Sequence, residues 1–200
     1  TDWEAIEMGC KEDADFVALS FIRRGDEIPE VREFIKKHGG NMKIITKVET
    51  RQSVEDIEAV IRESDGIMVA RGDLGAEMPF EKIPRVQNDI VDRCIKAGKP
   101  VIVATHMLES MIQNPIPTRA EVTDVFYAAE THADSTMLSG ESANGKYPFK
   151  SAESMAKILV EAESTMQRGS IVERAPHHSD SMRIINDAKS ENAEAIVVST

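Results

Sequence analysis

Short apolar runs alternate with segments of helical spacing along this chain, and this rhythm constrains the fold more than any other feature. Each run ends in small or polar residues and predicts a buried strand. The five runs are Asp15 to Phe21, Met42 to Glu49, Gly66 to Asp73, Pro100 to Thr105 and Ser135 to Gly140.

The other segments have the spacing and the end signals of helices. They are the opening residues, Ile28 to His38, Ser53 to about Glu63 with Ser53 as the cap, Val86 to Ala97 before Gly98, and Ser151 to Arg168. Thr118 to Glu121 has the capping-box pattern, in which a hydroxyl and a carboxylate satisfy free backbone donors. Strands that alternate with helices predict a parallel α/β sheet, either open and doubly wound or closed as a barrel.

Unusual polar residues stand at the carboxyl ends of the predicted strands. They come from four successive units and are Lys47, Glu49, Asp73, Thr105 and Ser139. A barrel gathers its strand ends around one mouth, whereas periodicity alone does not separate the two sheet types. This placement therefore favours the barrel.

Lys47 and Glu49 lie two residues apart on one strand, so their side chains leave the same face. A structural ion pair at the rim of the sheet is one interpretation. The other is that Glu49 and Asp73 converge on one Mg²⁺ ion, which takes one or two protein carboxylates and fills its octahedron with other oxygens. Asp73 taken alone also suits a helix cap or a turn.

Thr105 and Ser139 each bring a hydroxyl to the end of a strand. A hydroxyl there can donate to a substrate carboxylate or pass on a proton, although either residue taken singly also suits a turn or a cap.

Other candidate sites are weaker. Gly140 to Lys146 fits most of the phosphate-loop pattern, but Tyr147 stands where that loop needs a short hydroxyl. His106 could act as a base, His132 could lie on the surface, and the pair His177-His178 could bind a stray metal ion. No spacing makes a metal site of these histidines.

The formal net charge of −11 argues against binding to nucleic acid or to an anionic membrane. Cys10 and Cys94 lack the spacing of a zinc site or of a disulfide framework, and no apolar run is long enough for a membrane span. We therefore expect a cytoplasmic protein with reduced thiols. The first residue is Thr1 and already belongs to a predicted helix, so we expect the chain to be cut from a longer protein.

A second unit is expected near the end of the chain. Gly169 and a polar stretch follow the last long helix, then Ser181 to Ser190 predicts a helix and Ala195 to Ser199 a strand. The expected division is residues 1–170 for the main unit and 171–200 for a linker and the start of a second α/β domain.

Over Thr1 to Gly169 the sequence resembles the pyruvate kinase family in the order and the spacing of its motifs. The strongest stretches are Ser20 to Arg23, Lys43 to Glu49, Ser64 to Gly75, Ala97 to Met111, Pro117 to Glu121 and Met137 to Glu141. The resemblance implies a partial (β/α)8 TIM barrel, about strands four to eight, followed by the start of a C-terminal α/β domain. It also implies a homotetramer in the full-length enzyme.

The resemblance further implies transfer of the phosphoryl group of phosphoenolpyruvate to ADP, which yields pyruvate and ATP. In that family Lys47 would stabilise the phosphoryl group, and Glu49 with Asp73 would bind Mg²⁺ or Mn²⁺. The backbone of Ala70, Arg71, Gly72 and Asp73 would receive the substrate carboxylate together with Thr105, and Ser139 would serve the proton path. The K⁺ ligands belong to residues that this chain lacks.

Two residues depart from the family pattern, because Thr46 stands where Ser or Ala is usual and His106 stands where Gln is expected. His106 would add pH sensitivity if it faced the site. Without the other residues of the enzyme we expect these 200 residues to be inactive, and a half-barrel would expose two sheet edges that invite self-association. The alternatives are a Mg²⁺-dependent aldolase or lyase of the phosphoenolpyruvate/pyruvate barrels and a non-catalytic interaction fragment.

Overall fold

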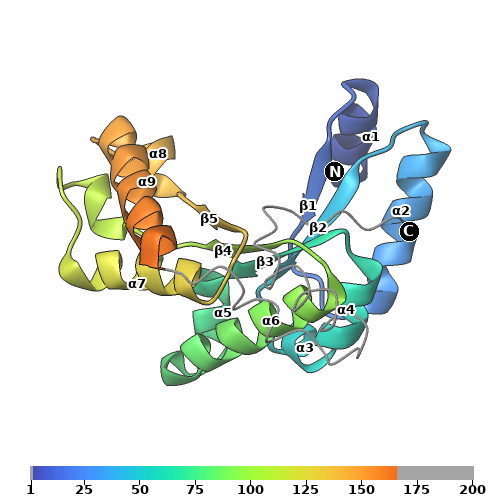
Figure 1. Cartoon of the computed structure of the whole chain (residues 1–200). Coiled ribbons are helices and arrows are strands. Elements are labelled where there is room, and N and C mark those ends of the chain that lie inside the picture. The colour runs from blue at the N-terminus through green and yellow to red at the C-terminus, as the bar shows by residue number, and fades with distance from the viewer. Residues whose placement is uncertain (1, 166–200) are drawn as a thin grey trace, which may run out of the picture. The chain divides into compact units, whose positions relative to one another are not determined.

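The computed structural model describes residues 2–165, which form one parallel sheet with helices packed against it (Figure 1). Its strands are β1 (Phe16–Leu19), β2 (Lys43–Val48), β3 (Gly66–Ala70), β4 (Val101–Ala104) and β5 (Ser135–Met137). All five predicted strands are present, and each ends earlier than predicted because the polar residues at its carboxyl end leave the ladder. The predicted run from Gly66 to Asp73 is corrected most, since the chain becomes helical from Arg71.

The order of the strands separates the two sheet types that the sequence left open. The sheet runs β1-β2-β3-β4-β5, and every neighbouring pair is parallel. A doubly wound sheet reverses its strand order at a switch point, and no reversal occurs among the described strands. Right-handed connections between consecutive parallel strands place their helices on one face of the sheet. This arrangement is that of a partial barrel, and the predicted fold class is confirmed.

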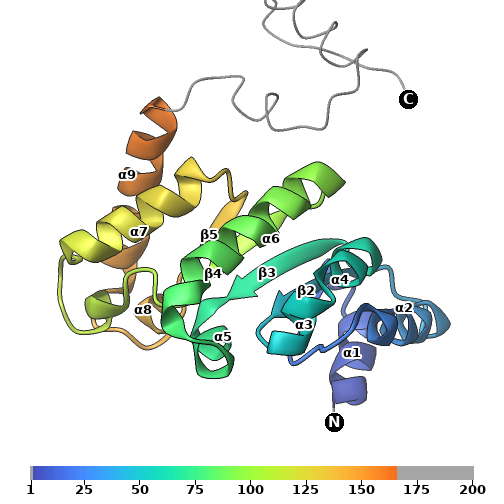
Figure 2. The same ribbon diagram turned by 90° about the horizontal axis from the view of Figure 1, so that it is seen from below.

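Nine α-helices lie within residues 2–165. They are α1 (Asp2–Lys11), α2 (Ile28–Lys37), α3 (Arg51–Glu55), α4 (Ile57–Glu63), α5 (Arg71–Glu77), α6 (Ile83–Ala97), α7 (Arg119–Glu130), α8 (Gly140–Ala143) and α9 (Pro148–Thr165). Figure 2 shows the same helices from below. Two predicted helix ends are confirmed. Gly98 ends α6 in the left-handed conformation, and Thr118 with Glu121 forms the capping box at the start of α7.

The predicted cap Ser53 is wrong. Thr50 is the N-cap of α3, and its hydroxyl accepts from the Ser53 amide at 3.1 Å. Both residues have short hydroxyl side chains, but Thr50 has the extended backbone that a cap needs and also donates to the Ile22 carbonyl at 3.1 Å. The helix then breaks at Asp56, so the single helix expected here is two.

The core lies between the sheet and the helices. On β2 the side chains of Ile44, Thr46 and Val48 are buried, whereas Lys47 on the opposite face is partly open. That opposite face is least covered at β1, where Phe16 is 61% exposed. One face of the sheet is therefore sealed by helices, and the other is open near its edge.

The last long helix begins at Pro148, three residues before its predicted start. Its predicted end at Arg168, the linker, the pair His177-His178 and the elements expected in 181–199 lie outside the described residues. Within the described part, no helix has the length and apolar character needed to cross a membrane.

Candidate functional site

The predicted site residues follow neighbouring parallel strands at one edge of the sheet. Lys47 is near the end of β2, Glu49 comes directly after it, Thr105 comes directly after β4, and Ser139 follows β5. Asp73 was expected directly after β3, but it lies instead in the first turn of α5. Because the strands are parallel, their carboxyl ends meet at the same edge.

Lys47 and Glu49 form an ion pair, as their spacing on the strand predicts. The Lys47 Nζ lies 3.0 Å from Glu49 Oε2 and donates to Ser20 Oγ at 2.9 Å. The Glu49 side chain is fully buried, while the Lys47 side chain is 24% exposed. The ammonium therefore reaches solvent, and the carboxylate depends on protein groups for its stabilisation. Ser20 belongs to a motif that carries the family resemblance, but no role was predicted for its side chain.

Glu49 has one oxygen bound by the backbone and one with spare capacity. Its Oε1 accepts from the Phe21 amide at 2.5 Å, and Phe21 itself has a left-handed backbone with φ 57°. Among the described residues its buried Oε2 accepts no hydrogen bond, although the Lys47 ammonium lies 3.0 Å away as its ion-pair partner. A buried carboxylate oxygen without a hydrogen bond is costly unless a cation shares it. In this structure the Lys47 ammonium at 3.0 Å is that cation, and the same oxygen is also the kind of hard donor that a divalent cation takes.

Asp73 differs from Glu49 because its side chain is exposed. Within residues 2–165 no group of three His, Cys, Asp or Glu side chains is arranged to hold a metal ion by itself. A Mg²⁺ ion needs fewer protein ligands than that, since water and substrate oxygens complete its shell. The donor set Glu49 and Asp73 fits this ion better than it fits a zinc site.

Thr105 sits in a strained turn and touches the start of α5. Its backbone φ is 70°, and that of the next residue, His106, is 53°. The Thr105 hydroxyl donates to the Ala104 carbonyl at 2.6 Å and accepts from the Gly72 amide at 2.7 Å. Two consecutive left-handed residues other than glycine mark a turn that the surrounding structure must hold in place.

The Arg71 side chain turns inward and binds the Thr105 turn. The side chain is 10% exposed, and its Nη1 lies 2.6 Å from Asp124 Oδ1. It also donates to the Thr105 carbonyl at 2.7 Å and more weakly to the Ala104 carbonyl at 3.4 Å. Only the backbone of Arg71 is therefore left for a ligand at the strand end, and neither Asp124 nor this inward contact was found from the sequence.

Ser139 and Glu141 shape the end of β5. The buried Glu141 carboxylate accepts from the amides of Leu108 at 3.0 Å and Ser139 at 2.7 Å. The Ser139 Oγ is buried and makes no hydrogen bond to any of the described residues. Its proton and its lone pairs are thus uncommitted. The stretch Gly140 to Lys146 folds as the short helix α8 and a turn.

The two departures from the family pattern have different surroundings. Thr46 is buried on the helix side of β2, where its hydroxyl is 2.7 Å from the Ser64 hydroxyl. It therefore points away from Lys47. The His106 ring lies beside Gly72, because a Cβ added to Gly72 would stand 3.4 Å from His106 Cε1.

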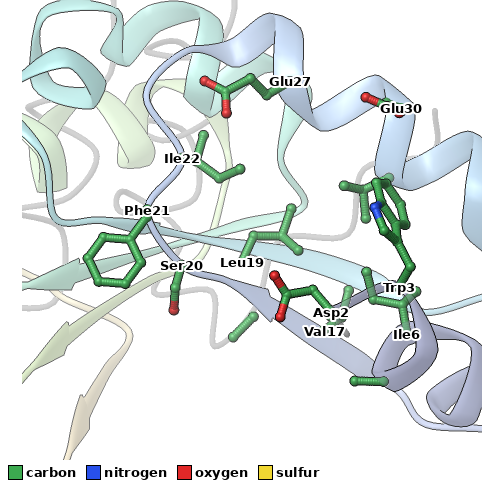
Figure 3. Close-up of a pocket in the computed structure, with 13 residues that line it drawn as sticks. Asp2, Trp3, Ile6, Val17, Leu19, Ser20, Phe21, Ile22, Glu27 and Glu30 are labelled. Carbon is green, nitrogen blue, oxygen red and sulfur yellow. The ribbon is translucent and has the colours of Figure 1, made fainter.

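A cavity of about 700 Å³ adjoins Ser20 and Phe21 between α1, β1 and α2 (Figure 3). The carboxylates of Asp2, Glu27 and Glu30 lie among its lining, around apolar side chains. This acidic lining disfavours an anionic ligand. The cavity is therefore a poor candidate for a phosphate, and the sequence did not predict it.

Comparison with known proteins identifies the same family as the motifs do. The family model described as "Pyruvate kinase, barrel domain" matches residues 1–152. A pyruvate kinase of Clostridium perfringens is 45% identical over 96% of this chain and 41% of its own length. A pyruvate kinase of Dictyostelium discoideum is 51% identical over 79% of the chain and 31% of its own length. The chloroplastic pyruvate kinase isozyme G of Nicotiana tabacum is 46% identical over 84% of the chain and 30% of its own length. The chain thus spans less than half the length of these relatives.

Proposed function

The chain belongs to the pyruvate kinase family, and from this premise we propose that it supplies the Mg²⁺- and phosphoenolpyruvate-binding part of a phosphotransferase. The reaction is transfer of the phosphoryl group of phosphoenolpyruvate to ADP, giving pyruvate and ATP. The main support is the pair Lys47 and Glu49, in which an ammonium that reaches solvent lies 3.0 Å from a fully buried carboxylate. The comparisons lend no support to an aldolase, a lyase or an interaction fragment.

Lys47 acts on the transferring phosphoryl group in this proposal. Phosphoryl transfer requires little covalent chemistry from the protein, and its main need is neutralisation of charge on the phosphoryl oxygens. The Lys47 ammonium is held by Glu49 and Ser20, so its position is fixed before substrate arrives. A preorganised charge of this kind needs no rearrangement at the moment of transfer.

Glu49 and Asp73 would hold the Mg²⁺ or Mn²⁺ ion. When bound, the ion neutralises phosphoryl and carboxylate oxygens and orients them for in-line transfer. The buried oxygen of Glu49 and the exposed carboxylate of Asp73 together provide the two protein ligands that such an ion accepts. The K⁺ requirement belongs to residues outside this chain.

The substrate carboxylate would meet Thr105 and the backbone of Ala70, Arg71, Gly72 and Asp73. The Gly72 amide already donates to the Thr105 hydroxyl, so binding must redirect that hydrogen bond or share it. Ser139 would pass the proton that converts enolpyruvate to pyruvate, and its uncommitted buried hydroxyl is suited to that exchange. Thr105 and Ser139 are therefore proposed beside Lys47 as catalytic groups.

We also propose where the chain belongs in the full-length enzyme and where that enzyme works. Residues 1–170 form the C-terminal part of the catalytic barrel, and 171–200 form a linker and the start of a second α/β domain. The full-length enzyme works in the cytoplasm as a homotetramer on phosphoenolpyruvate and ADP, without nucleic acid or membrane partners. These 200 residues alone are inactive.

The test uses a protein of the relatives' full length that contains these 200 residues. Pyruvate and ATP are measured from phosphoenolpyruvate with Mg²⁺ and K⁺, with and without ADP. Equal amounts of pyruvate and ATP that appear only with ADP support the proposal. Pyruvate without ATP, independent of ADP, would favour a hydrolytic or lyase activity instead.

A further inference from the structure

The turn after β4 needs an external restraint. Thr105 and His106 are consecutive non-glycine residues with φ 70° and 53°, a conformation that L-residues adopt at a cost. The Thr105 hydroxyl depends on this turn for its contact with the Gly72 amide at 2.7 Å. A relaxed turn would move that hydroxyl away from the start of α5.

The Arg71 guanidinium supplies the restraint from the start of α5, directly after the neighbouring strand β3. It donates to the Thr105 carbonyl at 2.7 Å, to the Ala104 carbonyl at 3.4 Å and to Met107 Sδ at 2.8 Å. Arg71 directly precedes Gly72, so the side chain and the following amide bind the same turn from two sides. The planar fork of donors fixes the direction of these hydrogen bonds, which an ammonium would not do.

Asp124 on α7 is the anion that orients this guanidinium. Its Oδ1 lies 2.6 Å from Arg71 Nη1, and the two side chains are 34% and 10% exposed. The other acceptor on that nitrogen, Gln87 Oε1, is neutral and lies farther away at 3.4 Å. A guanidinium this buried is poorly compensated by neutral groups alone, so the carboxylate determines where it stays.

We propose that Asp124 is a positioning residue for substrate binding, acting through Arg71 on the Thr105 turn. The inference rests on the proposed function, in which Thr105 and the Gly72 amide meet the substrate carboxylate. Asp124 is 53 residues from Arg71 in the sequence and reaches the Thr105 turn through the Arg71 guanidinium. It links helix α7 to the substrate carboxylate site.

The test is Asp124→Asn in the full-length protein, because the amide keeps the shape of the side chain and removes its charge. We expect the KM for phosphoenolpyruvate to rise about tenfold, the size of effect that one charge-assisted hydrogen bond gives. The KM for ADP and the Mn²⁺ affinity without substrate stay within about twofold of the unchanged protein. Arg71→Lys should reproduce the effect, and Asp124→Glu should restore part of the affinity.

The matched control is Asp89→Asn. Asp89 forms the same kind of pair with Arg93 at 2.9 Å, but on the exposed surface of α6. We expect it to leave both KM values unchanged. Equal effects of the two variants, or a general loss of kcat without a change in the KM for phosphoenolpyruvate, would overturn the inference.

Hydrogen exchange separates this inference from the proposed function. Asp124→Asn should speed exchange about tenfold in peptides covering residues 70–75 and 103–108, and Asp89→Asn should not. Faster exchange in a protein that makes no pyruvate would refute the proposed function and keep the positioning role. Unchanged exchange refutes the positioning role whatever the activity, and Asp124→Glu gives a second reading should the asparagine variant fail to fold.

Discussion

The ion pair between Lys47 and Glu49 should respond unequally to loss of either partner. Lys47→Met leaves the Glu49 carboxylate fully buried, with the Phe21 amide on Oε1 as its remaining hydrogen bond among the described residues. Glu49→Gln leaves an ammonium that is 24% exposed and still bound to Ser20. We therefore predict that the lysine change is the more destabilising of the two.

The magnitudes follow from burial. Removing one partner of a buried ion pair costs about 3–5 kcal/mol when the other charge stays buried, which describes Lys47→Met. Glu49→Gln keeps the acceptor for the Phe21 amide, and water can reach the ammonium, so we expect a loss of about 1–2 kcal/mol. The double variant removes the buried charge altogether and should cost about 2–3 kcal/mol less than the sum of the single changes.

The assay is urea unfolding followed by circular dichroism, in metal-free buffer so that cation binding does not contribute. All four proteins of the cycle are measured at the same concentration and ionic strength. A larger loss in Glu49→Gln than in Lys47→Met, or additive losses in the double variant, would refute the reasoning from burial.

Three further predictions concern pH, thiol chemistry and packing. Burial alone would raise the pKa of Glu121, but hydrogen bonds from Ser110 and the Thr118 cap outweigh it and lower that pKa. The resulting stabilisation is present above the ordinary carboxyl pKa and is lost as pH falls through the folded value. After screening, Glu121→Gln should therefore cost at most about 1 kcal/mol at pH 7, and this loss should shrink as the pH is lowered through the folded pKa of Glu121 in unfolding curves; a loss that does not change with pH contradicts this. Burial raises the pKa of the Cys94 thiol to about 12, so alkylation at pH 8 should leave it unmodified in the native protein, and rapid native labelling by mass spectrometry would count against it. A Cβ on Gly25 would stand 2.5 Å from the carbonyl carbon of Ala59, so Gly25→Ala should cost about 2–3 kcal/mol. Gly39→Ala, at φ 74° in open space, should cost only about 1 kcal/mol, and a melting-temperature series with the opposite ranking would show the packing argument to be wrong.

Local patterns predicted the elements of this fold well, because apolar runs and helix caps are short-range features. Local patterns do not determine the order of the strands in the sheet, because that order depends on contacts between segments far apart in the sequence. Ser53 shows the limit even locally: Thr50 and Ser53 have equivalent hydroxyl chemistry, and only the backbone conformation decides which of them caps α3. The end of β3 was misplaced because Arg71 to Gly75 suits a tight turn and a short helix equally well.

The candidate site was predicted where its geometry follows from spacing. Lys47 and Glu49 share a face of β2 because they are two residues apart, and their ion pair follows. The Arg71 side chain was not predicted, because its partner Asp124 belongs to a helix that meets it only in the folded chain. The left-handed backbone of Thr105 was also not predicted, because threonine and histidine rarely adopt positive φ and the local sequence contains no glycine or asparagine that would indicate it.

In the proposed function, Lys47 serves phosphoryl transfer at a site whose other groups handle the enol. Exchange of the C3 protons of pyruvate with solvent involves no phosphoryl transfer, so its rate measures the enol-handling groups of the same site separately. In the full-length protein with Mg²⁺ and K⁺, Lys47→Met should lower ADP-dependent pyruvate formation at least about 10²- to 10³-fold and keep most of the proton exchange. Retained exchange also shows that the variant is folded. Undiminished phosphoryl transfer in Lys47→Met, in a protein whose unchanged form makes pyruvate and ATP, would contradict the account.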